Sequence, residues 1–590
     1  MNERTKTGLE ILSAALLIGV LGNVLLRVTP WGLNAFVFVA IFTAAMITIT
    51  ARRRPELLTF RTLALQGAMV FFGAMFVIRD SIELRVYDTF AIVIIMGVLV
   101  LPNFGINARI AGAFHYAVGF IWSGISSLLA PFVLLGADIE WKAMPGNRLS
   151  KNIFAVLRGL AIALPLVLVF GALFMAADAA YEGMVNRAIN FDLNNIISHV
   201  ILTSVFAWLT AGYFRGTLVE HFRPSAPIVS PIPKDEPKDA ELRKSESGVV
   251  SKFSAEPSDG ERALPNNATI LDHINQSDPP NGARTLLSAS ETESSSAAEP
   301  KTRDWQNWDN TRFPQVFTLG TVETVIILGL VDLLFVSFVA VQIPYLFGGM
   351  DLVQTTPDFK LAEYARRGFG ELVAVSALVL PMLLASHWLL RRDNVRNENI
   401  FRALAGFQIV LLFVIMASAV QRLVLLTGEL GYGMTTIRFY PMVFMLWLAV
   451  VFVWFAVTVL RGARQHFAWG ALWSAIVILG ATNLFNPDAF IVKTNIALMH
   501  QGRDFDARYN SNDLSDDAIP QLIEALPTLN PDDQCWVKWK LHVRMNETKG
   551  ESDVRSWNIS RSVVRERLQS NHASIESNGA CEPHLNFDEY

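Results

Sequence analysis

The sequence predicts an all-α integral membrane protein, a polytopic helical bundle with a small helical tail outside the membrane. Of its 590 residues, 52% are hydrophobic and only 17% are charged, which is too little charge for the surface of a soluble protein. The hydrophobic residues are concentrated in runs of about 20, the length of a helix that crosses a bilayer. Backbone groups in lipid must be hydrogen-bonded within the chain, so we expect helices and not open strands.

Eleven apolar runs fit membrane spans. In chain order they cover residues 8–26, 31–50, 62–78, 87–102, 159–177, 193–214, 324–347, 368–390, 403–427, 434–460 and 467–485. The first run follows Arg4 and Lys6, as in a signal peptide. No small-residue cleavage site and soluble domain follow it, so we expect this run to be retained as the first helix.

A further apolar stretch, residues 104–138, decides the topology. Basic residues gather in five groups, which are Arg52–Arg54 with Arg61, Lys142–Arg158, Arg215 with Arg223, Arg391–Arg402, and Arg461 with Arg464. All five lie on one side only if 104–138 is a re-entrant or interfacial segment that enters and leaves by the same face. This eleven-span topology places the N-terminus in the cytoplasm and the C-terminus outside. If 104–138 crosses the membrane, the protein has twelve spans.

Composition divides the chain into four parts. Residues 217–313 are rich in Pro, Ser, Glu, Asp and Asn, and such a segment is expected to be disordered. The predicted parts are an N-terminal transmembrane half, a disordered linker, a C-terminal transmembrane half and a polar tail, at residues 1–216, 217–313, 314–485 and 486–590. In the tail, the capping Ser515 and Pro520 predict a helix over 514–526. Trp536 and Trp539 indicate a second short helix or a strand edge.

Polar residues gather at the predicted outer ends of the spans. The candidate binding residues are Asp178, Gln342, Tyr345, Glu363, Tyr364, Arg366, Arg367, Glu371, Arg422, Arg438, Tyr440, Asn486 and Asp488. Charges so close to lipid should pair, and we expect Glu371 to pair with Arg422 or Arg438. Guanidinium groups bind carboxylates and phosphates bidentately, which favours a small anionic ligand. The alternative is that these residues only join helix ends.

One acid is placed differently. Asp332 lies in the inner half of the run 324–347, and an isolated acid inside the membrane is a candidate for a proton or ion pathway. The alternative is a neutral carboxyl group that is hydrogen-bonded to a neighbouring helix.

Motifs of familiar enzymes are missing from the sequence. It has no phosphate-binding glycine loop, no Gly-x-Ser-x-Gly elbow and no His-x-x-x-His pair, so we predict no cofactor, no metal and no catalytic residue. The net charge of -4 argues against a nucleic-acid partner and leaves the lipid bilayer as the expected one. The two cysteines, Cys535 and Cys581, permit one disulfide in the tail.

Several segments resemble a bacterial family of multi-pass membrane proteins. They are Pro165–Asp178, Gln342–Gly349, Ala362–Phe369, Gly433–Arg438, Asn486–Ala489 and Leu514–Pro520. The family is catalogued as domain of unknown function 4173 and is related to the 4153 group; the resemblance covers roughly residues 155–525. It implies a bacterial inner-membrane protein and no particular activity.

Three functions remain open at this point. The leading hypothesis is a transporter-like or ligand-sensing protein whose arginine and carboxylate cluster faces the outside. The second is an integral-membrane enzyme for an anionic or lipid-linked envelope substrate, with Glu363 or Glu371 as the acid or base. The third is a structural membrane scaffold.

Overall fold

The structure is a computed structural model, and it describes residues 2–140, 193–219, 318–347, 369–391, 395–429, 433–547 and 553–576. All of them belong to one unit, formed by residues 1–222 and 304–590. By length and composition, 11 of the described helices are able to cross a membrane. Ten of these coincide with predicted spans, and the eleventh is residues 113–138. The predicted span 159–177 lies outside the described residues.

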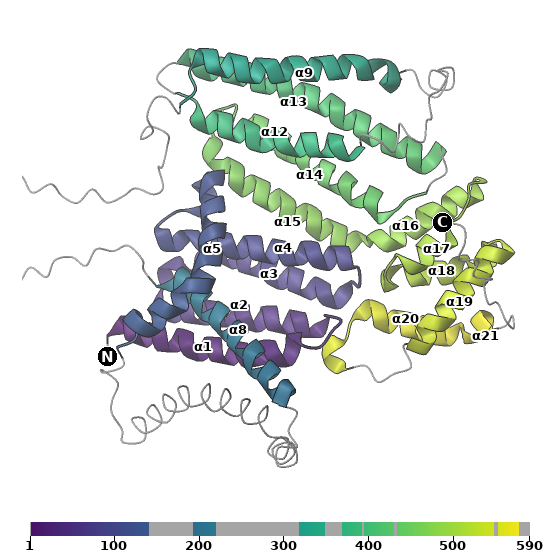
Figure 1. The fold of residues 1–590 in the computed structure, drawn as a ribbon, viewed down its shortest axis with the longest axis horizontal. Helices are drawn as coiled ribbons and strands as arrows, with labels where there is room; N and C mark the ends of the chain where they lie inside the picture. The colour runs from purple at the N-terminus through teal and green to yellow at the C-terminus, as the bar shows by residue number, and fades with distance from the viewer. Residues whose placement is uncertain are drawn as a thin grey trace, which may run out of the picture. The chain divides into compact units, whose positions relative to one another are not determined.

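Five long helices come from the N-terminal part of the chain. They are α1 (Glu3–Leu26), α2 (Leu33–Arg53), α3 (Phe60–Ile78), α4 (Ile82–Leu99) and α8 (Leu193–Leu218). Consecutive helices run up and down beside one another, and α8 packs along α1 (Figure 1). Glycine permits this close approach, because a Cβ atom on Gly19 would lie 2.6 Å from the Cβ atom of Ala207. The helices enclose an apolar core that includes Ile18, Met69 and Phe72.

The C-terminal half contributes five further helices. They are α9 (Thr321–Phe347), α12 (Phe369–Leu389), α13 (Val395–Val424), α14 (Thr436–Thr458) and α15 (Phe467–Phe485). Helix α13 packs between α9 and α12, and α14 packs against α15. Helix α15 also contacts α4, and so joins the two sets of helices (Figure 1).

Helix α5 (Ala113–Val133) and the π-helical turn to Asp138 form the segment on which the topology depends. Near its start, Phe114 stacks on Trp388 at the end of α12, with ring centroids 5.9 Å apart. At its other end, Asp138 forms a salt bridge of 2.7 Å to Arg4, at the start of α1. Both ends therefore lie at the same end of the bundle, and Figure 1 shows α5 running across it. The eleven-span topology requires this arrangement; the topology itself stays a prediction.

The described members of the predicted basic groups lie at one end of the bundle. The end at which α1 begins carries the described basic residues Arg53, Arg54, Arg61, Arg215, Arg391, Arg402 and Arg464. Several of them are held in place there; for example, the Arg53 Nη1 atom lies 2.9 Å from the Glu3 carboxylate. The polar tail packs at the opposite end.

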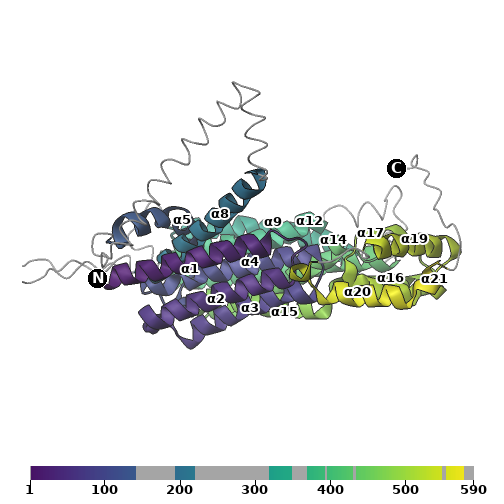
Figure 2. The ribbon, with the colours of Figure 1, turned by 90° about the horizontal axis from the view of Figure 1, so that it is seen from below.

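The tail is a small helical layer. Its helices are α16 (Pro487–His500), α17 (Ala507–Asn512), α18 (Ile519–Ala525), α19 (Pro531–Glu547), α20 (Ile559–Ser570) and α21 (His572–Glu576). Figure 2 shows them at the end of the bundle that lies opposite the N-terminus. The helix predicted over 514–526 begins as a 3₁₀ turn capped by Ser515 and continues as α18. Trp536 and Trp539 lie on a helix and not on a strand.

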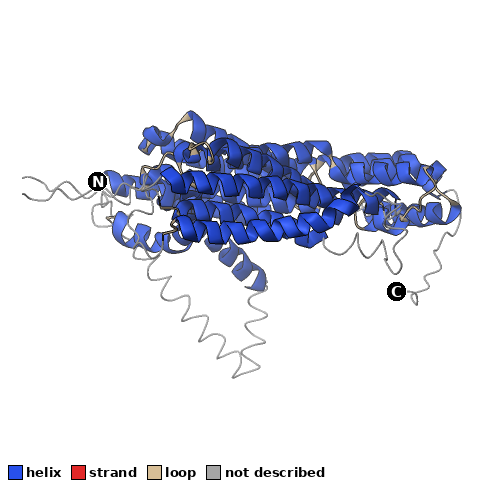
Figure 3. Cartoon of the chain, turned by 90° about the horizontal axis from the view of Figure 1, so that it is seen from above, coloured by secondary structure: helices blue, strands red, loops and turns tan. Residues whose placement is uncertain are grey.

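The tail shares its core with the membrane helices. Ile491, Val492 and Leu522 of the tail pack in one apolar cluster with Leu84 of α4 and Phe439 of α14. Cys535 is disulfide-bonded, and the chain's other cysteine, Cys581, lies outside the described residues. The described residues contain helices and loops but no β-strand, which confirms the predicted all-α class (Figure 3).

Candidate functional site

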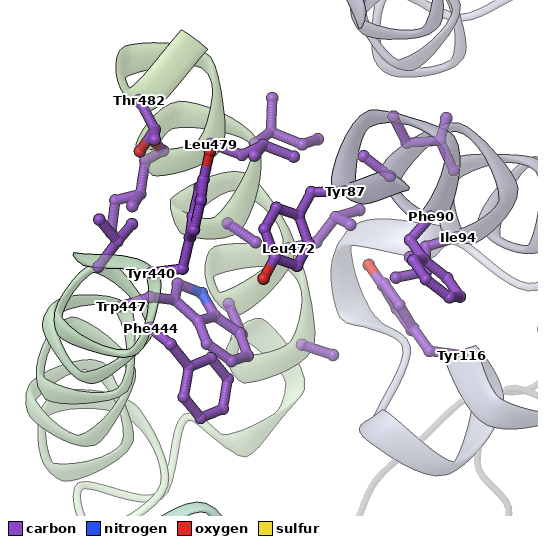
Figure 4. Close-up of a pocket in the computed structure, with 18 of the residues that line it drawn as sticks. Tyr87, Phe90, Ile94, Tyr116, Tyr440, Phe444, Trp447, Leu472, Leu479 and Thr482 are labelled. Carbon is purple, nitrogen blue, oxygen red and sulfur yellow. The ribbon is translucent and has the colours of Figure 1, made fainter. Parts of the chain in front are cut away.

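An apolar groove runs along α15, between α4 and α14. Its volume is about 620 Å³, and its walls include Phe90 and Ile94 of α4, Phe444 and Trp447 of α14, and Leu472 of α15 (Figure 4). The lining residues on α15 extend from Phe467 to Thr482, which corresponds to about 22 Å at the rise of an α-helix. The groove therefore covers most of the thickness of the hydrocarbon core of a bilayer, which is about 30 Å.

Two tyrosines form the rim of the groove nearest the tail. Tyr87 and Tyr440 both line it, and their ring centroids lie 5.2 Å apart. The Tyr440 hydroxyl lies 3.3 Å from the Ser81 hydroxyl, which donates a hydrogen bond of 2.9 Å to Glu83. Tyrosine suits such a boundary because its ring is apolar and its hydroxyl group is polar. An apolar cavity thus meets hydrogen-bonding groups at one end.

The turn between α3 and α4 connects this rim to the tail. One oxygen of Asp517 accepts hydrogen bonds from the backbone amides of Asp80 (2.7 Å) and Ser81 (3.2 Å). Its other oxygen lies 3.7 Å from the Arg79 guanidinium. Arg79 also donates to the carbonyl oxygen of Asn483 (2.6 Å), near the end of α15, where a helix favours positive charge. The side chain of Asp517, a residue of the tail, therefore anchors the α3–α4 turn to the tail.

A second set of contacts holds α20 on the same turn. The Asn558 side chain donates to the carbonyl oxygens of Phe76 (2.9 Å) and Arg79 (2.8 Å), which end α3. The Arg561 guanidinium lies 3.3 Å from Asp80, which also pairs with Arg85. Burial raises the pKa of Asp80 and lowers that of Arg561. Removing either side chain would therefore leave the other as an unpaired buried charge, which destabilises the folded state.

Among the candidate binding residues that the structure describes, Asp488 is the most buried acid. It is 1% exposed, and its Oδ2 atom accepts hydrogen bonds from the Ser515 amide (3.1 Å) and hydroxyl (2.5 Å). Its Oδ1 atom has no partner among the described residues. Burial raises the pKa of Asp488 to about 6. Just before it, Asn486 adopts the left-handed conformation and caps α16, since its side chain accepts from the Ala489 amide.

The structure brings only part of the predicted cluster together. Tyr440, Asn486 and Asp488 belong to the network between the rim and the tail. Arg438 is half-buried at the start of α14 and donates to the Gly433 carbonyl oxygen, whereas Arg422 is buried near the end of α13. The remaining residues are outside the described side chains: Asp178, Gln342, Tyr345, Glu363, Tyr364, Arg366 and Arg367. An arginine site for a small anion stays a prediction.

Two interactions considered from the sequence are not seen among the described residues. Glu371 is exposed in the first turn of α12, and among the described residues it forms no ion pair with Arg422 or Arg438. Asp332 is 4% exposed in the middle of α9, and neither of its carboxylate oxygens has a hydrogen-bond partner among the described residues. The alternative of a neutral carboxyl group hydrogen-bonded to a neighbouring helix thus has no contact among the described residues to support it, and the role of Asp332 in a proton or ion pathway stays a prediction.

Sequence reasoning did not identify the residues on which the network depends. Arg79, Asp80 and Arg85 lie in and beside a short turn between two spans, and Asp517 and Arg561 lie in the tail. A signal was present, because four charged residues within Arg79–Arg85 are unusual between two membrane helices. Arg79 and Asp80 have partners more than 400 residues away, as for Asp80 and Asp517, so spacing alone did not predict the pairing.

No metal centre accompanies this network. Among the described residues, no group of three or more His, Cys, Asp or Glu side chains is placed to hold a metal ion. The acids near the α3–α4 turn bind arginine side chains and backbone amides instead.

Comparison with known proteins matches most of the chain to a family without an assigned function. The model of a family described as domain of unknown function 4153 matches residues 66–241 and 283–525. These ranges include the groove, the α3–α4 turn, Asp488 and Asp517, and the interruption at 242–282 falls inside the predicted linker. No curated protein and no solved structure matches the chain. The description of the family names no activity, so a function has to be argued from the geometry of the site.

Proposed function

We propose that this chain, which belongs to the DUF4153 family, is a ligand-sensing membrane protein whose groove binds the hydrocarbon chain of an amphipathic lipid. The lipid's head group is expected at the rim formed by Tyr87 and Tyr440, beside Ser81 and Glu83. The proposal rests on the multi-pass architecture that the long apolar helices of the described residues indicate.

The chemistry of the groove supports a lipid over a water-soluble ligand. Its walls are almost entirely hydrocarbon and aromatic side chains, and it lies along helices that are long and apolar enough to cross a bilayer. A polar ligand would lose its hydration there without regaining hydrogen bonds, which is unfavourable. Hydroxyl groups occur at the tail end of the groove, where a lipid head group can form hydrogen bonds.

One residue links the groove to the tail, and this observation carries the sensing proposal. Tyr440 lines the groove, and its hydroxyl contacts Ser81, whose backbone amide is bonded to Asp517 of the tail. A bound lipid that moves the Tyr440 ring therefore disturbs a hydrogen-bonded turn on which the tail rests. A ligand shifts the equilibrium between two conformations of a protein only if it contacts the two conformations differently. A lipid in the groove can do so through Tyr440, whose ring lines the groove and whose hydroxyl contacts the turn.

We further propose that the protein lies in the inner membrane of a bacterium, with its N-terminus in the cytoplasm and its tail outside. Positive residues favour the cytoplasmic side, and the described basic groups lie at the end where α1 begins. A disulfide at Cys535 suits an oxidising compartment, which supports an extracytoplasmic tail.

Native mass spectrometry with a groove-filling variant tests the binding. Ala475 lines the groove, so Ala475→Trp places an indole in the volume that the lipid chain needs. Val477 lies on the same helix, is 61% exposed and does not line the groove, which makes Val477→Trp the matched control. We expect the wild type and the control to retain one lipid after washing with detergent, and Ala475→Trp to lose it. Equal retention by both variants would contradict the binding site.

Hydrogen exchange of the tail tests the sensing step separately. Removal of the lipid should change amide protection in α18 and in the α3–α4 turn. Tyr440→Phe should retain the lipid but reduce this response, because it removes the hydroxyl that reaches Ser81. If lipid removal leaves protection unchanged in the wild type, the protein is a scaffold with a lipid-filled groove and does not sense the lipid through its tail.

A further inference from the structure

In the described part of the C-terminal half, Asp332 and Gln408 are buried polar side chains without a hydrogen-bond partner. Asp332 on α9 is 4% exposed and Gln408 on α13 is 0% exposed. Both oxygens of Asp332, and both the oxygen and the nitrogen of Gln408, lack a partner among the described residues. A buried polar group without a hydrogen bond destabilises the folded state, and more so if it is charged. Two such residues on neighbouring helices therefore require an explanation.

The helix pair places these residues at the same level. Helices α9 and α13 run in the same direction and pack together along their length (Figure 1). At their starts, the Thr321 hydroxyl is hydrogen-bonded to the Asn397 side chain. Asp332 follows Thr321 by eleven residues, and Gln408 follows Asn397 by the same number. Both are thus about 16 Å along their helices from that contact.

Both residues also occupy the buried stripes of their helices. On α9 the buried positions near Asp332 are Leu328, Phe335 and Val339, and on α13 those near Gln408 are Phe401, Ala405, Leu412 and Ile415. Steps of three and four residues characterise helix faces that pack on each other. Asp332 and Gln408 interrupt these two apolar stripes in the same layer.

We propose that Asp332 and Gln408 form a proton-binding site in the core of the C-terminal half. When a proton from water binds to Asp332, the neutral carboxyl group can donate its O–H to the Gln408 oxygen. The other carboxyl oxygen can accept from the Gln408 amide, which satisfies both side chains. When the proton leaves, the O–H donor is lost, the Gln408 oxygen is left without a donor, and the carboxylate has only the amide N–H to stabilise it. Proton binding therefore selects the packed arrangement of α9 and α13.

Other charged groups lie at the ends of the neighbouring helices. On α9, Glu323 precedes Asp332 by nine residues, or about 13 Å. On α13, Arg396, Glu398 and Arg402 precede Gln408, and Arg422 follows it by fourteen residues, or about 21 Å. Helices α12 and α14, which pack on α13, carry Glu371, His387, Arg438 and Tyr440 near their ends. Among the described residues of these four helices, Asp332 is the one titratable group in the middle layer.

Infrared spectroscopy of the full chain in lipid nanodiscs tests this site. A protonated carboxyl group has a C=O stretching band that is separate from the amide bands and moves on deuteration. We expect the wild type to show such a band at acidic pH and to lose it at alkaline pH. Other carboxyl groups, such as buried Asp488, absorb in the same region, so the band of Asp332 is taken from the difference between the wild-type and Asp332→Asn spectra. Glu323→Gln, which removes an acid from the start of the same helix, should retain it. A difference spectrum without such a band at acidic pH overturns the proposal.

Gln408 is tested by its effect on the same band. Gln408→Leu removes the partner, so the band should move to higher frequency; an unchanged frequency overturns the pairing. If Asp332→Asn does not fold, Gln408→Glu replaces it, because two coupled carboxyl groups should titrate in two steps and a single step overturns the site. Replacing choline chloride by sodium chloride at constant pH should leave the band intact. Loss of the band in sodium chloride would overturn proton binding in favour of a cation site.

Discussion

Asp488 should make the stability of the tail depend on pH. It is a buried residue of the tail. One of its oxygens accepts two hydrogen bonds from Ser515, and the other has no partner among the described residues. Burial raises its pKa from 3.8 to about 6, which means that the folded tail binds this proton more tightly than the unfolded tail does. Asp488→Asn replaces this group by one that does not titrate.

The sign and size of the effect follow from the two pKa values. Between about pH 4 and pH 6 the folded state binds more protons than the unfolded state, so the stability of the tail falls as the pH rises through this range. Above about pH 6 the contribution is constant. The difference between 3.8 and about 6 corresponds to about 3 kcal/mol. Asp80, whose pKa burial also raises, adds to the trend with the same sign.

Hydrogen exchange of α16 and α18, corrected for the pH dependence of intrinsic exchange, measures the free energy of opening. We expect the difference in the free energy of opening, Asp488→Asn minus wild type, to increase by about 3 kcal/mol as the pH rises from about 4 to 7. Any constant offset reports the altered hydrogen bonds to Ser515. Asp513→Asn removes an exposed acid from the same tail and is the control. A difference between Asp488→Asn and wild type that does not change with pH would refute the reasoning.

Two further predictions concern the topology and the packing of α5. A membrane-impermeant maleimide, applied to intact cells, should label Cys535 and Cys581 only after reduction, as expected for a disulfide-bonded tail outside the membrane. Labelling that requires permeabilised cells would contradict this orientation. Gly212→Ala would place a Cβ atom 2.4 Å from the Ser126 carbonyl oxygen, so α5 and α8 should move apart at a cost of about 1–3 kcal/mol. Gly124→Ala meets nothing within 4 Å, and equal thermal stability of the two variants would contradict this contact.

The membrane helices were predictable because their signal is local. A run such as 467–485 is apolar throughout, and lipid leaves a helix as the only way to satisfy its backbone; α15 spans Phe467–Phe485. The helix at 514–526 was predictable for the same reason, since Ser515 caps it with its own side chain. Length, apolarity and capping are properties of neighbouring residues, so they can be read along the chain.

The candidate site was only partly predictable. The sequence indicated that polar groups gather at one end of the spans, and Tyr440, Asn486 and Asp488 do meet there. It did not indicate that Asp517 holds Asp80 and Ser81, because pairing over such a separation depends on how the helices pack. Glu371 illustrates the converse, since its nearness to arginines in the predicted topology did not produce an ion pair with Arg422 or Arg438, the candidate arginines that the structure describes.

By itself, the sequence determined that this is an all-helical membrane protein with a polar tail, and it identified Asp332 as an acid inside a span. Only the tertiary structure decided that α4, α14 and α15 enclose an apolar groove, that the tail rests on the α3–α4 turn, and that Gln408 lies level with Asp332. The physical reason is that hydropathy and capping act between neighbours in the chain. Cavities, ion pairs and helix register arise from side chains that packing alone brings together.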